Sequence, residues 1–256
     1  MSTVLVEARD GVTTMTLDSP PVNALGRQLV GDIEQALAAL KDDATVRCLV
    51  VRSGGKHFCA GADLKERRTM TEDEVRAFVP RLAGVCHGLA GLPFPTVAAV
   101  RGAAAGGGCE LALGCDMRIL ADDTRIGLRE TALAIIPGAG GTQRLPRLIG
   151  PAKAKRWIFG AEMHDAAAAL ADGVADRVVA TDQLDDAAHA LAMTIAANGP
   201  VALRLAKRAI EEGADLALPE ALQKEWDCYQ GVLKTADRVE ALVAFAEQRA
   251  PKFEGR

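Results

Sequence analysis

The sequence has no apolar run that approaches the roughly 20 residues needed for a membrane-spanning helix. It also lacks a basic-then-apolar signal segment and an Arg/Ser-rich transit peptide, because residues 1–18 go directly into alternating, strand-like sequence. Its 30 basic and 34 acidic residues are mixed along the chain, and the net charge of −4 gives no overall bias toward nucleic acid or anionic membranes. We therefore expect a cytoplasmic protein, or a mature organellar one.

Metal and redox motifs are missing as well. The six cysteines form no CxxC pair and have no cysteine–histidine spacing typical of zinc. Most of them stand inside apolar runs, so we interpret them as reduced core thiols. The histidines offer no ligand cluster either, and these are His57, His87, His164 and His189. No metal and no redox cofactor is expected.

Neither glycine-rich segment, at 106–108 or at 138–141, matches a nucleotide-binding loop. A Walker loop needs a lysine after its second glycine, and neither segment supplies one. The pattern GxGxxG fails because Cys109 and Glu110 follow the first segment and Thr142 follows the second. Nicotinamide and nucleoside-triphosphate chemistry are therefore poor candidates. The glycines can still expose N–H groups that bind an anion at a helix start, or simply let two elements pack closely.

The sequence does contain a clear alternation of strand and helix patterns. Residues 4–7 and 12–17 predict a β-hairpin around Asp10-Gly11, and helical spacing of apolar residues follows at 26–40. Further strands are predicted at 47–53, 96–100 and 117–121, with helices between them, which favours parallel strands with crossover helices. From residue 151 the chain reads almost continuously as alanine-rich helix. We predict a core of residues 1–190 and a helical region of residues 191–256.

Three ordered segments closely resemble the crotonase superfamily, which is the enoyl-CoA hydratase and isomerase family. They are HFCAGADLKE at 57–66, AAGGGCELALGCDMRI at 104–119 and ETALAIIPGAGGTQRLPRLIG at 130–150. The likeness extends over essentially the whole chain. It implies an α/β fold, a crotonase-type spiral of ββα units with a helical C-terminal trimerisation region, assembled as a homo-oligomer that is a trimer or a dimer of trimers. This agrees with the division predicted from composition.

The resemblance also implies an oxyanion hole for an acyl-CoA thioester. The backbone N–H groups at the matching positions belong to Ala62 and Gly107. Hydration of a conjugated thioester turns its carbonyl oxygen into an enolate oxygen, and two fixed donors stabilise that charge. Loss of one such donor typically costs about 10²–10³ in rate.

Glu110 and Glu130 match the two glutamates of the hydratases. One carboxylate takes a proton from water while the other supplies a proton to the α-carbon. Taken alone, Glu110 could simply complement the dipole of a helix N-terminus, and Glu130 could be a surface residue. At these matched positions we interpret both as catalytic, and which is acid and which is base stays open.

Coenzyme A is part of the expected substrate, so no separate cofactor is expected. By motif match the CoA and substrate contacts are Val22, Lys56, Ala60, Ala62, Asp63, Leu64, Lys65, Gly107 and Gly138. In one hydratase pattern a lysine from the C-terminus of a neighbouring subunit reaches the phosphate. The matching position here is Gln248, with Arg249 and Lys252 close by.

Within the family, FCAGADLKER and LAIIPGAGGTQRLPRLIG look most similar to methylglutaconyl-CoA hydratases. Such enzymes interconvert 3-methylglutaconyl-CoA and 3-hydroxy-3-methylglutaryl-CoA in leucine breakdown, and a short-chain enoyl-CoA hydratase of fatty-acid β-oxidation is the alternative. The first substrate carries a terminal carboxylate, which needs a cation or several donors. Candidates for that cation are Lys65, Arg67, Arg68 and Arg129.

The sequence also bears on two other classes of function, RNA binding and a catalytically silent scaffold. A relative among these hydratases is associated with AU-rich RNA through a basic helix, but in residues 65–81 of this chain acidic residues interrupt the basic ones, which weakens phosphate attraction. Nucleic acid is therefore an improbable partner. A catalytically silent scaffold is the other alternative, and the presence of both glutamates argues against it.

Overall fold

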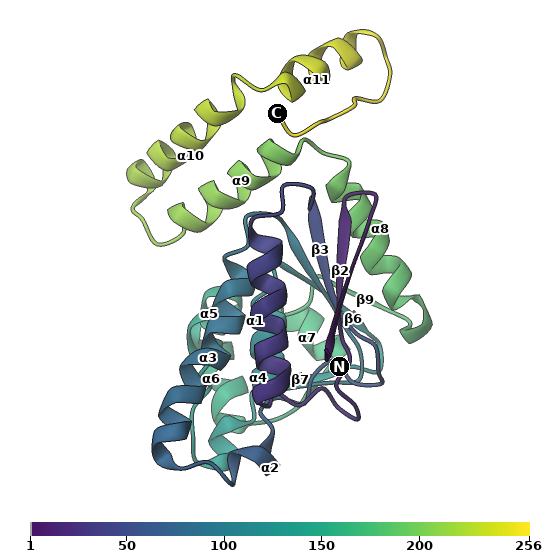
Figure 1. The fold of residues 1–256 in the computed structure, drawn as a ribbon. Coiled ribbons are helices and arrows are strands. Elements are labelled where there is room, and N and C mark those ends of the chain that lie inside the picture. The colour runs from purple at the N-terminus through teal and green to yellow at the C-terminus, as the bar shows by residue number, and fades with distance from the viewer. Residues whose placement is uncertain (1) are drawn as a thin grey trace.

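A six-stranded sheet forms the centre of the computed structural model, which describes residues 2–256 (Figure 1). The strand order is β1, β2, β3, β4, β6, β9, with β1 and β2 antiparallel and the pairs from β2 to β9 parallel. Met1, the first residue of the predicted core, lies outside the described residues. The strands of this sheet are β1 (Val4–Arg9), β2 (Val12–Leu17), β3 (Cys48–Ser53), β4 (Thr96–Val100), β6 (Met117–Ala121) and β9 (Arg177–Val179).

Helices connect the parallel strands, which agrees with the predicted alternation of strands and crossover helices. The predicted helix at 26–40 is α1, and the polar helical stretch after Thr71 is α3, whose Thr71 and Glu74 form a capping box. Up to the C-terminal region the helices are α1 (Arg27–Lys41), α2 (Leu64–Arg67), α3 (Glu72–Ala90), α4 (Gly107–Leu113), η1 (Glu130–Leu133), α5 (Gly141–Ile149), α6 (Pro151–Gly160), α7 (Ala166–Asp172), η2 (Thr181–Gln183) and α8 (Leu184–Ala196).

The predicted hairpin is present and turns at Asp10 and Gly11. Both residues have positive φ angles, 54° and 80° respectively. Two such residues give the mirror-image turn whose twist matches that of the flanking strands. Arg9 pairs with Val12 directly across the turn, so the two-residue loop determines the register of the β1–β2 ladder.

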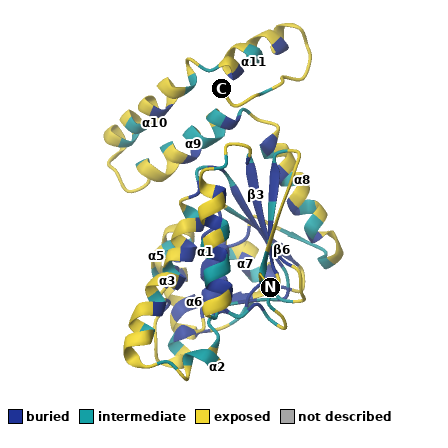
Figure 2. Cartoon of the chain, in the orientation of Figure 1, coloured by how far each residue is buried: buried dark blue, intermediate teal, exposed yellow. Residues whose placement is uncertain are grey.

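Side chains of the buried strand β3 alternate between two apolar layers. Leu49 and Val51 belong to the larger cluster, together with residues of α1, α3 and α4. Cys48 and Val50 belong to a second cluster, together with α8. Because successive side chains of a strand point to opposite faces, one short apolar run holds helices against both sides of the sheet. Figure 2 shows this sheet as the buried centre of the chain.

A second, three-stranded sheet lies beside the glycine run and was not predicted. It contains β5 (Ala103–Ala105), β7 (Arg125–Gly127) and β8 (His164–Asp165), with β5 parallel to β7 and β7 antiparallel to β8. Three alanines have little strand propensity, so tertiary pairing decides the conformation of β5. An isolated bridge between Cys59 and Ala104 attaches the HFCAGAD segment to this sheet.

Three helices form the C-terminal region and stand apart from the sheet layers (Figure 1). They are α9 (Pro200–Gly213), α10 (Leu218–Val232) and α11 (Ala236–Ala246). Lys207 attaches α9 to the core, because its buried Nζ donates to Asp116 Oδ2 at 2.9 Å and to Phe94 O at 3.2 Å. The division of the chain at residues 190 and 191 stays a prediction.

Large apolar side chains of these C-terminal helices are exposed. In Figure 2 the ribbon of these helices is mostly yellow, the colour of exposed residues. Phe245 is 86% exposed, Ile210 73% and Leu218 71%. In the described chain the six cysteines are free and buried, as the sequence predicted. Among the same residues, no helix is long and apolar enough to cross a membrane.

Candidate active site

The segments that contain Ala62 and Gly107 line one cavity of about 310 Å³, and Glu130 lines the same cavity. The segments come from the loop before α2, from β5 and the start of α4, and from η1. The bridges between Leu25 and Ala62 and between Cys59 and Ala104 hold the first two together. The lining residues are Ala60, Gly61, Ala62, Leu64, Ala105, Gly106, Gly107, Arg129, Glu130, Ala132, Leu133 and Ile135.

The glycines here allow close approach of backbone to backbone and of backbone to carboxylate. Gly106 has φ of +52°, and a Cβ added there would lie 2.8 Å from Glu130 Oε1. A Cβ on Gly108 would lie 2.0 Å from Cys59 O. Close packing, one of the two interpretations left open for the run, is therefore correct for Gly108. Gly106 instead combines a left-handed backbone with access to Glu130.

Two backbone N–H donors lie close together at this cavity. A Cβ built on Gly107 would lie 3.8 Å from Ala62 N, and one built on Gly61 would lie 3.2 Å from Gly107 N. Within residues 2–256, the N–H groups of Ala62 and Gly107 donate to no backbone or side-chain acceptor. Gly107 begins α4, where N–H groups have no partner inside the helix. Two convergent N–H groups of this kind can bind an oxyanion.

Glu110 lies one helical turn after Gly107 on α4 and is 2% exposed. Its Oε1 accepts hydrogen bonds from Ala139 N at 2.7 Å and from Gly141 N at 2.8 Å. Burial raises the pKa of Glu110, whereas the two N–H donors and the nearby Arg144 guanidinium lower it. The Glu110 carboxylate is therefore buried, and two hydrogen bonds fix its orientation. Both of them end on Oε1, so Oε2 does not accept either one.

Glu130 begins the short helix η1 and is 9% exposed, not on the surface. Burial, followed by the negative charge of Glu110, raises the pKa of Glu130 to about 7. Its Oε2 is buried and has no hydrogen-bond partner in the described part of the chain. At neutral pH this carboxyl group is thus poised between its two protonation states, with an oxygen available to a bound molecule.

The predicted CoA contacts fall into two groups. Ala60, Ala62, Leu64 and Gly107 line the cavity, and Val22 borders it because its carbonyl accepts from Ala60 N at 3.0 Å. The other predicted contacts do not line this cavity: Asp63, Lys56, Lys65 and Gly138. The Asp63 carboxylate caps α2 by accepting from Lys65 N and Glu66 N. Lys56, Lys65 and Gly138 are exposed.

Arg129 is the one cavity-lining residue among the four predicted partners for a substrate carboxylate. It precedes Glu130 directly, and in the described residues its side chain takes part in no ion pair or hydrogen bond. Lys65, Arg67 and Arg68 lie on or beside α2 and do not line the cavity. The geometry thus reduces four candidate cations to Arg129.

The C-terminal residues considered for phosphate binding, and His57, take part in contacts within the chain or in a turn. Arg249 pairs with Glu240 and Glu247, and Lys252 N donates to Glu240 Oε1 at 2.8 Å. His57 Nδ1 accepts from Ala103 N at 3.1 Å, so its imidazole supports the start of β5. Gln248 has φ of +54° in the chain reversal after α11.

Two basic residues of α3, Arg76 and Arg81, pair with carboxylates, as does Arg27 of the neighbouring α1. Arg27 lies 2.9 Å from Glu74, and Arg81 lies 2.6 Å from Glu34. Arg76 pairs with Glu72 on the same helix. These ion pairs weaken the attraction of α3 for RNA phosphates.

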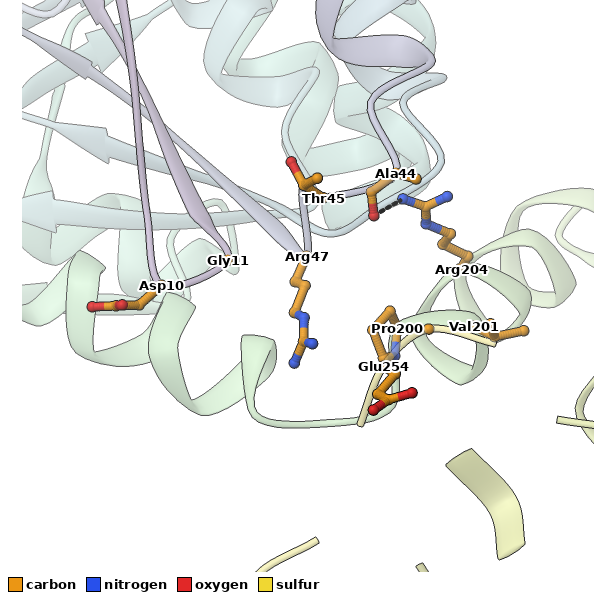
Figure 3. A pocket seen from close by; sticks show the side chains of 10 residues that line it. Asp10, Gly11, Ala44, Thr45, Arg47, Pro200, Val201, Arg204 and Glu254 are labelled. Atoms are coloured by element: carbon orange, nitrogen blue, oxygen red, sulfur yellow. Dashed lines mark hydrogen bonds between the residues drawn. The ribbon is translucent and has the colours of Figure 1, made fainter. Parts of the chain in front are cut away.

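Figure 3 shows another cavity, of about 600 Å³, between the β1–β2 turn, the loop before β3 and the start of α9. Arg204 points to the carbonyl of Ala44, and Arg47 donates to Ala196 O and Phe253 O. None of the predicted site residues lines it. Its arginines tie α9 and the C-terminal segment to the core.

Sequence reasoning missed the groups that hold Glu110. Ala139 and Gly141 donate to it, and Arg144 approaches it from α5. The only sequence signal was the second glycine run, GAGG at 138–141, which resembled the family without revealing its contact with Glu110. Among the residues described, no cluster of three or more His, Cys, Asp or Glu side chains is arranged to hold a metal ion.

Comparison with known proteins agrees with this architecture. The family model described as enoyl-CoA hydratase/isomerase matches residues 7–256, so the chain belongs to that family and is a hydro-lyase enzyme. A crystal structure of an enoyl-CoA hydratase from Bacillus anthracis superimposes with a TM-score of 0.98 at 41% identity, covering 100% of both chains. The predicted crotonase fold is therefore confirmed.

Two curated relatives show which members the chain is similar to. Methylglutaconyl-CoA hydratase, mitochondrial, from Mus musculus is 47% identical over 238 residues, covering 91% of this chain and 76% of the relative. Enoyl-CoA hydratase domain-containing protein 2, mitochondrial, from Homo sapiens is 44% identical over 252 residues, covering 96% of this chain and 86% of the relative.

The expectation of a cytoplasmic protein is wrong. Relatives at 42–47% identity from mouse, human and Arabidopsis thaliana are all named mitochondrial. The expectation was based on the absence of a recognisable leader pattern, and a leader is not part of the folded domain that these proteins share. The organellar alternative is the one that agrees with the relatives.

Proposed function

We propose that this protein reversibly hydrates a 2-enoyl-CoA thioester, with Glu110 and Glu130 as the proton-transfer groups and the N–H groups of Ala62 and Gly107 as the oxyanion donors. One observation carries this proposal: a single cavity is lined by two backbone donors that have no acceptor within residues 2–256 and by a buried carboxyl with a pKa of about 7, next to a second buried carboxyl. Membership of the enoyl-CoA hydratase/isomerase family supports the same reaction.

In the proposed reaction, water adds its oxygen to the β-carbon and a proton arrives at the α-carbon. The electron pair moves onto the thioester oxygen, where Ala62 and Gly107 stabilise the enolate by hydrogen bonds. Glu110 takes the proton from water, because its orientation is maintained by two N–H donors. Glu130 delivers the proton to the α-carbon, because its pKa of about 7 lets it carry a proton at neutral pH. Dehydration reverses both transfers, and the chemistry uses no cofactor.

The proposed substrate is 3-methylglutaconyl-CoA, which becomes 3-hydroxy-3-methylglutaryl-CoA, a step of leucine breakdown. The Mus musculus relative at 47% identity is named for this activity. The substrate ends in a carboxylate, and Arg129 is a cation that lines the cavity. Arginine binds carboxylates through two parallel N–H donors, so it suits this role.

A short-chain enoyl-CoA hydratase is the second candidate function. Most of the remaining cavity wall is apolar, with Ala132, Leu133 and Ile135 around the second glutamate. A plain alkyl chain fits such a wall without any cation. The human relative at 44% identity carries only the general name of an enoyl-CoA hydratase domain protein.

Activity on two thioesters distinguishes the methylglutaconyl-CoA hydratase from the short-chain enoyl-CoA hydratase. We would measure kcat/KM for 3-methylglutaconyl-CoA and for crotonyl-CoA from the loss of the enoyl-thioester ultraviolet band, in wild type, Arg129→Ala and Arg68→Ala. Loss of a charged hydrogen bond should lower kcat/KM for methylglutaconyl-CoA by about 10–100-fold in Arg129→Ala and leave crotonyl-CoA hydration nearly unchanged. Arg68→Ala, an exposed control, should match wild type. Equal losses on both thioesters would exclude Arg129 as the carboxylate partner.

We also propose that the protein is a homo-oligomer, a trimer or a dimer of trimers, assembled through residues 191–256. The exposed apolar residues of α9–α11 support this, because monomers rarely leave so many large side chains in water. Light scattering coupled to size exclusion would give the subunit number, and a stable monomer would contradict the proposal. No RNA-binding role is proposed.

A further inference from the structure

Arg144 lies behind Glu110, on helix α5, and does not line the cavity. Its Nη1 donates to Ala139 O at 3.1 Å, and Ala139 N donates to Glu110 Oε1 at 2.7 Å. The same residue, Ala139, therefore joins the guanidinium to the carboxylate. No substrate atom in the cavity needs to touch Arg144 for it to affect Glu110.

The glycines before α5 make this arrangement possible. Gly140 has φ of +110°, and a Cβ there would lie 2.0 Å from Arg144 Nη1. Gly141 donates its N–H to Glu110 Oε1 at 2.8 Å, and a Cβ on it would lie 3.1 Å from that oxygen. One glycine thus admits the guanidinium and the next admits the carboxylate.

Glu110, which Arg144 supports, lies among further acids and thiols. The negative charge of Glu110 raises the pKa of Glu130 on η1, of Cys86 on α3 and of Cys109 on its own helix. Burial raises the pKa of both thiols, so they stay neutral. His87 of α3 approaches the other side of Gly140, with Nε2 3.7 Å from the position of a Cβ there. Among these described groups, the Arg144 guanidinium lowers the pKa of Glu110.

We propose that Arg144 is a positioning residue for hydration: it holds Ala139 so that two N–H groups stay directed at Glu110, and it places a positive charge next to the Glu110 carboxylate. The inference rests on the proposed function, because it needs Glu110 to act as the proton acceptor. It assigns a role in proton transfer to a side chain that substrate does not contact.

Two substitutions separate the charge from the hydrogen bond. Arg144→Gln keeps a donor and removes the charge, whereas Arg144→Lys keeps the charge and removes the forked donor. Arg147→Gln is the matched control, since Arg147 lies on the exposed side of the same helix and pairs with Asp215. We would record pH profiles of kcat and KM with crotonyl-CoA, together with thermal unfolding of each variant.

Arg144→Gln should lower kcat by about 10–100-fold with little change in KM. It should also move the acid limb of the pH profile upward by about one unit, because loss of a nearby cation favours the protonated carboxyl. Arg144→Lys should lower kcat less and keep the acid limb at its wild-type position. An acid limb that stays in place in Arg144→Gln would overturn the proposal, since a merely structural role lowers activity without moving that limb.

Further variants cover the other outcomes. If Arg144→Gln does not fold, Arg144→Lys tests the proposal instead. Because lysine keeps the positive charge, an acid limb of the pH profile that moves upward in Arg144→Lys would contradict the proposal. Gly140→Ala should displace Arg144 and reproduce the raised acid limb. Loss of activity in Glu110→Gln together with an unmoved limb in Arg144→Gln would overturn this inference alone. Full activity in Glu110→Gln would instead overturn the proposed function.

Discussion

The two carboxylates of the cavity lie in unlike surroundings. Glu110 is held by two backbone N–H groups at one oxygen and has the Arg144 guanidinium behind it. Glu130 has a buried Oε2 without a partner in the described chain, and its pKa is raised to about 7. Both are buried glutamates, so burial alone does not separate them. The difference comes from the donors that each neighbouring backbone offers, and it gives one group a fixed orientation and the other a proton to transfer.

The largest effect should come from Glu110→Gln. Removal of a proton-transfer group should lower kcat by about 10²–10⁴, because the amide keeps the shape but cannot take a proton from water. Turnover of crotonyl-CoA is the measurement, and Glu72→Gln, on the exposed first turn of α3, is the control. Near-wild-type turnover in Glu110→Gln would show that the oriented carboxylate does not take part.

The raised pKa of Glu130 predicts a pH-dependent stability difference. Its pKa is about 7 in the folded protein against an ordinary value of 4.5, so its contribution is fully present below pH 4.5 and is lost as the pH rises through 7. Relative to Glu130→Gln, the wild type should lose about 3 kcal/mol between these limits. Urea unfolding of both proteins at one protein concentration tests this, and a difference that is independent of pH would mean that Glu130 titrates normally.

Gly106→Ala should disturb the Glu130 side of the cavity more than the Glu110 side. The new Cβ would lie 2.8 Å from Glu130 Oε1, at a backbone φ of +52°. We expect a fall in kcat of about 10–100-fold and a loss in stability of about 1–3 kcal/mol.

Gly84→Ala is the control for that substitution, because a Cβ there meets no heavy atom of the described chain within 4 Å. In the middle of α3, alanine should raise stability by about 0.5–1 kcal/mol and leave kcat unchanged. Equal activity of the two alanine variants would mean that the contact between Gly106 and Glu130 has no catalytic consequence.

The smallest effect is expected from Asp63→Ala, beside the oxyanion donor Ala62. The Asp63 carboxylate caps α2, so its loss should lower stability by about 1 kcal/mol with a small change in kcat. Asp63→Asn, which can still accept a hydrogen bond, should restore most of that stability in thermal unfolding. A large rise in KM for both variants at unchanged stability would instead make Asp63 a direct CoA contact.

Much of the site could be predicted because it follows from short segments. The AGAD and GGGCE segments located Ala62, Gly107 and Glu110, and the hairpin followed from Asp10-Gly11. The second sheet could not be predicted, since β5 consists of alanines that pair only because β7 is adjacent. The C-terminal region was predicted as helical from composition, and its exposed apolar side chains agree with the expected oligomer.

By itself, the sequence determined the family, the order of the first five strands of the main sheet, and the residue types that can transfer protons. Local spacing and turn chemistry suffice for those conclusions. Only the tertiary structure decided that Ala139, Gly141 and Arg144 support Glu110, that Glu130 is buried with a raised pKa, and that Arg129 is the cation at the cavity. These properties depend on contacts such as those from Glu110 to residues 29 and 31 positions away, and on the loss of water around them.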